Sequence, residues 1–428
     1  MGDQPRSAHL VPESLLMSHN DGDECYDTLL AATALLFANG QSTHMTLTAV
    51  ERLNRGLELD AVVVPTWSML TLTAAGSRET VLTAAVSPTA INMRRVASMM
   101  AVVDASQDGP LELDRVASGV VDAGAQPVSG TTAFAIACAT GAAALSVIYG
   151  ATQPLAILLV ALSAAAGGLL RRWSGAAGAG PLVQAFLAAL VAGAVGAAAT
   201  HLHLGASIAV VAICPAMVLV PGPHILNGAL DLLDLRVTLG LARLAYGLLV
   251  LTAISGGLIL GLRIGGQTLA VTAPPSSAPL IIDVIAAGVG AASYAVYFSM
   301  PWRMVVWPVA AGMLAHAAHW YALDVGASLA VAAFVSCLLV GVLLVPVSHR
   351  MRIPFAGIGF ASVVALVPGV FVFRTLAGFV EFAGHPSPQL FSSTAADLIV
   401  GTVIVTGMAL GLALPMHVYA SRLARRWM

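Results

Sequence analysis

The tetrapeptide Leu-Val-Pro-Gly occurs twice in this chain, at residues 219–222 and 366–369, each time late in a long apolar segment. Proline removes a backbone donor and clashes with the preceding helical turn, while glycine adopts dihedrals closed to other residues, so each apolar helix should break there. A broken helix leaves free N–H groups where it restarts and free C=O groups where it stops. Such groups suit a small zwitterion, whose carboxylate needs donors and whose ammonium needs acceptors.

The residues around the two breaks form the predicted binding site. We expect backbone donors from Gly222, His224 and Ile225 after the first break, and from Gly369 and Val370 after the second. Asn227 and Asp231 would reach an ammonium or hydroxyl group of the ligand. The full predicted site is Pro221, Gly222, His224, Ile225, Asn227, Asp231, Pro368, Gly369 and Val370. The alternative is that both interruptions are ordinary helix kinks.

Several ionisable residues lie in or beside apolar segments, where they are costly and therefore candidates for function. Asp283 and Asp397 each open an apolar segment, and His316 and His319 lie one helical turn apart. Groups that change charge during a cycle could couple transport to protons, and the candidates are Asp231, Asp283, His316 and His319. The histidine pair has ligand spacing, but no third ligand is placed by the sequence, so no metal site is predicted.

The composition places most of the chain in a membrane. Apolar residues make up 58% of the 428 residues and charged residues only 9%, far from the balance of a soluble domain. Residues 1–129 hold 7 arginines and 15 carboxylates, whereas residues 130–428 hold 12 arginines and 6 carboxylates. This asymmetry indicates an acidic soluble domain followed by a membrane domain. The four cysteines have no paired spacing, so neither a disulfide framework nor a metal site is predicted.

The soluble part is predicted to be a small α+β domain over residues 25–129, after a disordered stretch of residues 1–24. Helical spacing runs from Cys25 to Asn39 with Gly40 as its C-cap, and a second helix runs from Thr43, its N-cap, to Leu57. β-branched runs at residues 62–64, 69–73 and 80–86 then predict two or three strands, and helical spacing returns at residues 92–103 and 111–121. We find no nucleotide-binding loop or metal spacing in this domain, so no cofactor is predicted, and His44 is interpreted as a surface residue.

Ten apolar segments follow, most of them near the 17–25 residues that a spanning helix needs. Their bounds are about 130–150, 153–170, 182–200, 205–222, 239–262, 280–300, 303–321, 327–346, 355–376 and 396–416. Cytoplasmic loops carry the excess of positive charge. With the soluble domain inside, ten arginines lie on the inner side and only Arg263 and Arg374 on the outer side. Both termini are therefore expected in the cytoplasm of a multi-pass protein of the plasma membrane.

Ten helices divide into two sets of five, residues 130–264 and 280–428, with the interrupted helix fourth in each. An odd number of helices per repeat forces opposite orientations, which is the inverted-repeat arrangement of several secondary transporters. The loop before the first interrupted helix, residues 201–203, has no arginine, whereas residues 349–352 before the second have two. Opposite sidedness predicts this difference.

The run from Pro215 to Leu233, PAMVLVPGPHILNGALDLL, resembles the signature of the threonine/serine exporter family. The second Leu-Val-Pro-Gly is similar to the C-terminal half of that family. Residues 35–43 and Val63 to Trp67 resemble its cytoplasmic domain. The resemblance implies export of threonine and serine driven by the proton motive force, ten transmembrane helices and a cytoplasmic N-terminal domain. Because Asp231 lies inside the signature, we rank it first for proton coupling, before Asp283 and the histidines.

A second function remains open, a membrane-embedded hydrolase whose nucleophile is Ser42 or Thr43 near His44 in the N-terminal domain. A serine or threonine beside a histidine on a helix start has no oriented base, so the transporter is favoured and no catalytic residue is predicted. The expected partners are an amino acid, protons and the lipid bilayer, without nucleic acid. The oligomeric state is left open, a homo-oligomer included.

Overall fold

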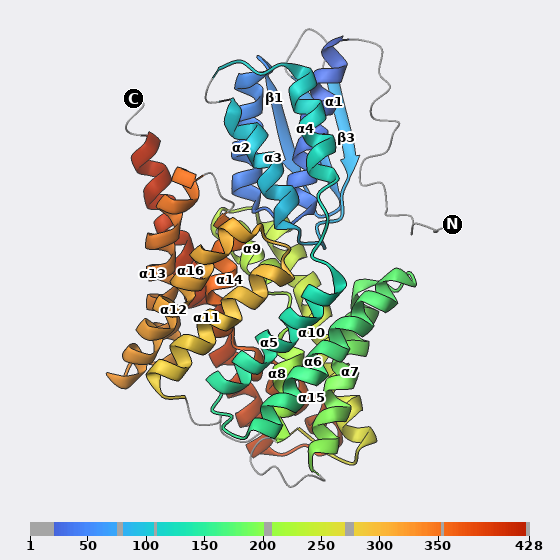
Figure 1. The fold of residues 1–428 in the computed structure, drawn as a ribbon, viewed down its shortest axis with the longest axis vertical. Coiled ribbons are helices and arrows are strands. Elements are labelled where there is room, and N and C mark those ends of the chain that lie inside the picture. Colours follow the sequence, from blue (N-terminus) through green and yellow to red (C-terminus); the bar gives the residue numbers. More distant parts are fainter. Residues whose placement is uncertain are drawn as a thin grey trace.

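The computed structural model describes residues 21–74, 80–106, 109–200, 208–269, 278–351 and 355–424. Figure 1 shows an α/β unit formed by the N-terminal residues, stacked on the end of a larger body made of helices. The C-terminal end of the last helix lies at the same end of that body as the α/β unit.

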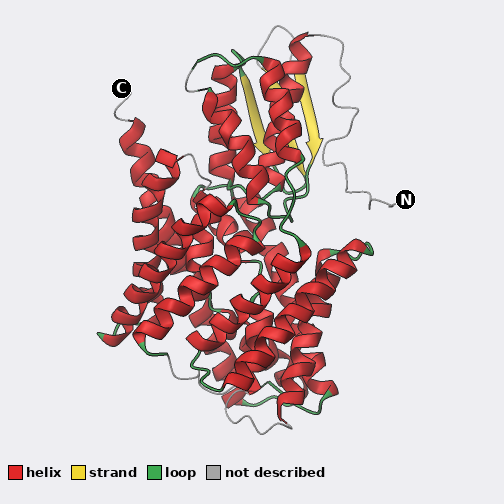
Figure 2. Ribbon diagram, viewed as in Figure 1, coloured by secondary structure: helices red, strands yellow, loops and turns green. Residues whose placement is uncertain are grey.

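The N-terminal unit is a three-stranded antiparallel sheet with helices on one face (Figure 2). Its strands β1 (Ala61–Pro65), β2 (Met69–Ala74) and β3 (Thr80–Ala85) pair in sequence order, with Val63 opposite Leu72 and Leu72 opposite Leu82. Inward side chains such as Val63 and Leu72 are buried, while Val62 and Val64 are exposed, as period-two alternation requires. The helices are α1 (Asp21–Ala38), α2 (Thr43–Gly56), α3 (Met93–Ala105) and α4 (Leu113–Gly124).

Three details of this unit differ from or refine the expectations. Helix α1 begins at Asp21, so residues 21–24 are helical instead of disordered, and residues 1–20 lie outside the described part of the chain. The N-cap of α2 is Ser42 and not Thr43, because the Ser42 hydroxyl accepts a hydrogen bond from the Met45 amide at 3.4 Å. Gly40 takes the left-handed conformation expected after α1, with φ of +94°.

The helical body contains every predicted apolar segment as a helix or a broken pair of helices. Its first half holds α5 (Thr131–Ile148), α6 (Pro154–Ala176), α7 (Pro181–Ala199), α8 (Ile208–Met217), α9 (Gly222–Leu233) and α10 (Val237–Ile264). Its second half holds α11 (Leu280–Tyr297), α12 (Trp302–Asp324), α13 (Leu329–Met351), α14 (Phe355–Val363), the 3-10 turn Val364–Leu366, α15 (Gly369–Gly384) and α16 (Pro388–Ala424).

Among the described residues, seven helices are long and apolar enough to cross a membrane alone. The bent pairs α8–α9 and α14–α15 raise that number to nine if each is one span. Helix α12 has 23 residues, the length of a span, but it carries Arg303, His316, His319 and Asp324 and does not meet the same hydropathy criterion. The body is thus a bundle of membrane-compatible helices.

The two breaks have the same geometry. Pro221 has φ −79° and ψ 53°, and Pro368 has φ −78° and ψ 50°. The Gly222 amide donates to the Val220 carbonyl and the Gly369 amide to the Val367 carbonyl, both at 2.8 Å. Each break is therefore an inverse γ-turn centred on proline, whose ring already holds φ near this value. Both pairs of helices bend by 60°.

The two halves also pack alike. In each half the first helix packs on the second and the second on the third, and the post-break helix packs on the last one. The third and last helices, α7 with α10 and α13 with α16, approach closely through glycines. A Cβ at Gly261 would lie 2.3 Å from the Leu190 carbonyl oxygen, and one at Gly411 would lie 2.6 Å from that of Phe334. The first helices of the halves, α5 and α11, pack on each other.

Two expectations for the helical body are corrected. The breaks do not lie late in their segments, since α9 and α15 continue for 12 and 16 residues beyond them. Helix α6 does not end at residue 170 but continues to Ala176. The helix can continue through Arg171 and Arg172 because their charged groups have hydrogen-bond partners on neighbouring elements.

Two of the arginines used for the orientation argument are also not loop residues. Arg243 lies inside α10, where its Nε is 2.9 Å from a carboxylate oxygen of Asp231. Arg374 lies inside α15, with its Nε 3.0 Å from a carboxylate oxygen of Asp397 on α16. Arg243 is buried and Arg374 largely so, and each forms an ion pair that joins a post-break helix to the next helix along the chain. Their positions therefore report packing and not sidedness.

Candidate functional site

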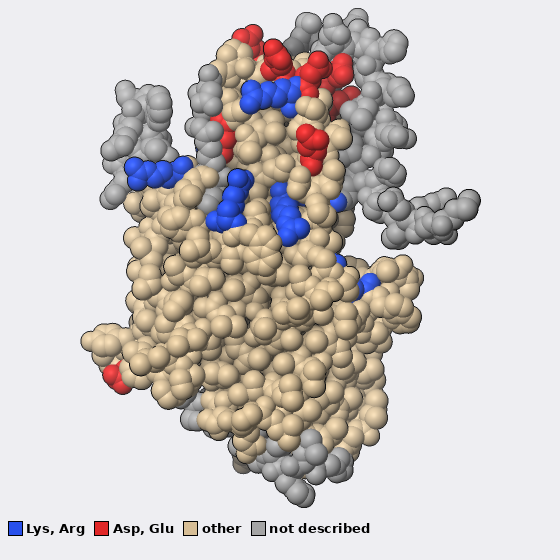
Figure 3. Space-filling model, viewed as in Figure 1, with Lys and Arg blue, Asp and Glu red and all other residues tan. Residues whose placement is uncertain are grey.

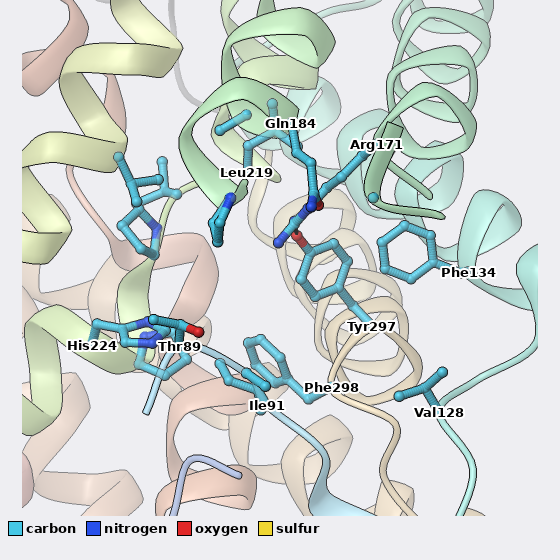
Figure 4. Close-up of a pocket in the computed structure, with 18 of the residues that line it drawn as sticks. Thr89, Ile91, Val128, Phe134, Arg171, Gln184, Leu219, His224, Tyr297 and Phe298 are labelled. Atoms are coloured by element: carbon cyan, nitrogen blue, oxygen red, sulfur yellow. Dashed lines mark hydrogen bonds between the residues drawn. The ribbon is translucent and has the colours of Figure 1, made fainter. Parts of the chain in front are cut away.

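A cavity of about 340 Å³ lies beside the first break. Leu219, Val220 and Pro221 of the break line it together with His224 on the first turn of α9. Figure 4 shows His224 on one side of this cavity and Arg171, Gln184 and Tyr297 together on another. The walls therefore come from α6, α7, α9 and α11 as well as from the break itself.

Arg171 is the cation that this cavity presents. Its guanidinium contacts the hydroxyl oxygen of Tyr297, and its central carbon lies 5.6 Å from the centre of that ring. Gln184 lines the same cavity, and its amide nitrogen donates to the Ala179 carbonyl at 2.7 Å, so its side-chain oxygen remains as an acceptor. A planar guanidinium beside a phenol and an amide oxygen can hold a carboxylate and orient the group next to it.

The guanidinium of the neighbouring Arg172 has other partners. It donates to the Ser129 carbonyl at 2.7 Å and lies over the Phe134 ring at 4.3 Å. It therefore fixes the linker between the α/β unit and α5, and its charge adds to the positive potential of the cavity. The described residues that line this cavity include no carboxylate.

Four of the five backbone donors predicted at the breaks are already used in this conformation. The Gly222 and Gly369 amides close the two γ-turns, and the His224 and Ile225 amides donate to the Pro221 carbonyl at 3.1 and 3.2 Å. The expectation that these amides are free is therefore wrong here. In each γ-turn the amide of the glycine donates to the carbonyl two residues before it. The general description of a helix N-terminus, in which the first amides are free, does not include this acceptor.

The breaks face each other across the two halves. A Cβ at Gly222 would lie 1.8 Å from Cζ of Phe360 on α14, and one at Gly369 would lie 3.1 Å from Cγ of Met217 on α8. A space of about 10 Å³ near the two breaks is lined in part by Met217, Phe360 and Gly369. Val370 is buried among apolar side chains of the first half. The two breaks are thus brought together, but the open cavity adjoins the first one.

Asn227 and Asp231 lie away from that cavity. They line a second one of about 80 Å³, together with Ser42, Thr43 and His44 of the α/β unit. Besides its ion pair with Asp231, Arg243 donates to the Thr43 hydroxyl at 3.3 Å. Partial removal from water lowers the pKa of His44 below its ordinary value, while Asp234 acts in the opposite direction. This cavity lies between the α/β unit, α9 and the C-terminal part of α16.

The structure brings together two of the other ionisable candidates. Nδ1 of His316 on α12 lies 2.9 Å from a carboxylate oxygen of Asp283 on the first turn of α11, and both residues are buried. The His319 ring lies 6.3 Å from that of His316. Asp231 instead forms ion pairs with Arg243 at 2.9 Å and with Arg236 at 3.7 Å. Among the described residues no group of three or more His, Cys, Asp or Glu side chains is arranged to hold a metal ion.

Sequence reasoning did not select Arg171, Gln184 or Tyr297. The arginine distribution places Arg171 among the inner loops or helix ends, and no motif marks Gln184 or Tyr297. The two adjacent arginines, Arg171 and Arg172, at the end of an apolar run are the one sequence feature that points to this site. A helix can continue through such residues when their side chains find partners.

The chain matches two family profiles, one over the α/β unit and the first half of the body and one over the second half. The profile described as "Putative threonine/serine exporter" matches residues 27–265, and the profile described as "Threonine/Serine exporter, ThrE" matches residues 283–418. The chain belongs to the threonine/serine exporter family. This membership and the apolar helices make it a multi-pass membrane protein, and the family points to export of amino acids.

A relative of this threonine/serine exporter family member is an uncharacterised protein of Haemophilus influenzae, 24% identical over 137 residues. The match covers 32% of this chain and 46% of that protein, less than half its length. No solved structure matches the chain.

Proposed function

We propose that the protein exports threonine and serine from the cytoplasm through the cavity beside the first break. One observation carries the proposal, the placement of Arg171, Tyr297 and Gln184 on a cavity of about 340 Å³ that adjoins a broken helix. Arg171 holds the substrate carboxylate, since a guanidinium pairs with a carboxylate in two parallel hydrogen bonds. The Gln184 oxygen accepts a hydrogen bond from the ammonium or hydroxyl group.

The proposed architecture is ten transmembrane helices in two inverted five-helix repeats, with the α/β unit and both termini in the cytoplasm and the body in the plasma membrane. The equal geometry of the breaks at Pro221 and Pro368 supports the repeat. The matching packing of α7 with α10 and of α13 with α16 supports it too. The cavity then opens toward the α/β unit, so the described conformation faces the cytoplasm.

Proton coupling is assigned to Asp283 and His316, with His319 beside them. A buried carboxylate 2.9 Å from an imidazole shares a proton readily, and both groups can change charge. Asp231 is placed after this pair because its carboxylate is already engaged in ion pairs with Arg243 and Arg236. Protons taken up at the far end of α11 would be exchanged for substrate that leaves the cavity.

The test of the substrate site is threonine flux in proteoliposomes with Arg171→Gln. Loss of a hydrogen bond to a charged group costs about 1.5–3 kcal/mol, so KM for threonine should rise about 10- to 100-fold while the maximal rate falls less. Arg303→Gln is the matched control, since Arg303 is exposed and lies outside the cavity. An unchanged KM in Arg171→Gln would exclude Arg171 as the carboxylate ligand.

The hydrolase alternative gains no support from the α/β unit. The Ser42 hydroxyl caps α2 and the Thr43 hydroxyl accepts from Arg243, so both candidate nucleophiles have structural partners. Purified protein that moves labelled threonine and cleaves no ester or peptide would separate the two functions.

A further inference from the structure

Part of the cavity wall comes from outside the helical body. Thr89, Ala90 and Ile91, on the connection between β3 and α3, line the cavity, as does Val128 on the linker to α5. These residues belong to the α/β unit and its linker, which carry no break and no coupling residue. The cavity is therefore incomplete without the α/β unit.

Two contacts hold this connection against the first half of the body. Nε2 of His224 lies 3.1 Å from the carbonyl oxygen of Pro88, which accepts its hydrogen bond. The Trp67 ring, on the turn between β1 and β2, lies 5.2 Å from Tyr246 of α10, and the His224 ring lies 4.9 Å from the same tyrosine. One end of the α/β unit thus rests on the break through aromatic contacts and one hydrogen bond.

Backbone hydrogen bonds fix the other side of the connection to the second half. The Met93 amide donates to the Phe298 carbonyl at 2.9 Å, and the Arg94 amide donates to the Ser299 carbonyl at 3.1 Å. Phe298 and Ser299 follow α11 directly and line the cavity themselves. Because both ends of the connection are tied down, residues 89–91 hold a defined position on the cavity.

We infer that residues Thr89, Ala90 and Ile91 of the α/β unit form a size-limiting wall of the transport cavity, so that this unit takes part in selecting the substrate. Figure 4 shows Thr89 and Ile91 across the cavity from Arg171. A substrate whose carboxylate is held by Arg171 directs its side chain toward these residues. The inference rests on the proposed function for the identity of the substrate, and on the cavity geometry alone for the position of the wall.

The first test is Ala90→Trp in the full-length protein. Ala90 is exposed to the cavity and not packed in the core of the α/β unit, so an indole there fills the cavity without disturbing that core. Threonine flux should fall at least tenfold. Ala101→Trp is the matched control, because Ala101 is an exposed alanine on α3 of the same unit that does not line the cavity. Equal flux in both variants would overturn the inference.

The second test asks whether the wall selects substrates. Ile91→Ala removes three carbons from the wall, and one carbon in an apolar pocket changes discrimination by about 10-fold or more. The ratio of kcat/KM for leucine over that for threonine should rise at least tenfold. A ratio that does not change, in a variant that still transports threonine, contradicts a size-limiting role.

A third measurement separates failure of the wall from failure of the proposed substrate. In a background without native cysteines, Pro88→Cys and His224→Cys are treated with a short bismaleimide, and the cross-linked peptides are sought by mass spectrometry. The cross-link should form whether or not threonine is the substrate, and its absence would overturn the placement of the wall. A parent protein that cross-links here but moves neither threonine nor serine contradicts the proposed function only.

Discussion

At the scale of residues, the protein depends on two prolines in nearly the same conformation. Pro221 and Pro368 differ by 1° in φ and 3° in ψ, and each is followed by a glycine whose amide closes an inverse γ-turn. The glycines matter for a second reason, since each approaches a side chain from the pre-break helix of the other half. The contacts are unequal, because Gly222 meets a rigid ring and Gly369 meets a flexible methionine.

This inequality predicts different outcomes for two equivalent substitutions. Gly222→Ala should reduce threonine flux at least tenfold, because its Cβ would lie 1.8 Å from the Phe360 ring and something must shift. Gly369→Ala should be milder, since Met217 can move from 3.1 Å. The double variant Gly222→Ala with Phe360→Ala should recover flux. Flux in Gly222→Ala equal to that of the parent would contradict the close approach of the two breaks.

At the scale of elements, the third and last helices of each half, α7 with α10 and α13 with α16, pack closely at glycine residues. Such glycines let helix backbones approach in lipid, where packing and not water exclusion drives association. A Cβ at Gly261 of α10 would lie 2.3 Å from the Leu190 carbonyl oxygen, a backbone atom that cannot rotate away. At Gly256 on the same helix it would lie 3.7 Å from the Phe186 ring, an ordinary contact.

We therefore expect Gly261→Ala to lower the stability of the detergent-purified protein by about 1–3 kcal/mol, the range for overpacking, and Gly256→Ala to leave it nearly unchanged. Thermal unfolding followed by circular dichroism measures both variants. A Gly261→Ala variant with the midpoint of the parent would show that α7 and α10 are not packed as closely as described.

Helix α11 connects the candidate coupling pair to the cavity. Its 18 residues span about 27 Å at 1.5 Å per residue. Asp283 lies on its first turn, whereas Tyr297 at its other end contacts Arg171. Tyr294 donates to the Met217 carbonyl at the end of α8, at 3.3 Å. A change in the charge of Asp283 or His316 therefore acts at one end of α11, the helix whose other end contacts the cavity and the first break.

This arrangement predicts that Asp283→Asn uncouples transport. The variant should keep threonine exchange down a gradient but lose proton-driven accumulation, because the amide cannot bind and release a proton in this pH range. Asp324→Asn at the end of α12 is the control, since Asp324 is exposed. Proteoliposomes with and without an imposed pH gradient give the comparison. Undiminished accumulation in Asp283→Asn would remove this residue from the coupling mechanism.

At the scale of the whole molecule, the proposed orientation places the α/β unit and the end of α16 on the cytoplasmic side (Figure 1). Figure 3 shows arginines on the body near its junction with the α/β unit, and none on the described part of the opposite end in this view. This distribution agrees with positive charge in the cytoplasm.

The orientation predicts the outcome of cysteine labelling in intact cells. A cysteine at position 385, in the exposed connection between α15 and α16, should react with an impermeant maleimide, and one at position 176, at the end of α6, should not. Labelling at position 176 but not at position 385 would show that the protein has the opposite orientation in the membrane.

Much of the element order followed from the sequence, because apolar runs, prolines and β-branched alternation act locally. The strands β1 to β3 and the paired breaks at Pro221 and Pro368 were predicted within a few residues. The cavity could not be predicted, since Arg171 and Tyr297 are 126 residues apart and meet only when α6 packs near α11. The pairing of Asp283 with His316 likewise depends on how α11 and α12 pack.

The most direct test of the proposed function is threonine transport by the purified protein in liposomes. With the cavity side facing the threonine-containing buffer, an opposing proton gradient should drive labelled threonine across the membrane above its equilibrium level. Unlabelled serine should compete, and collapse of the gradient with an ionophore should return threonine to equilibrium. Liposomes that show the same threonine flux as empty vesicles, under every gradient, would contradict the account.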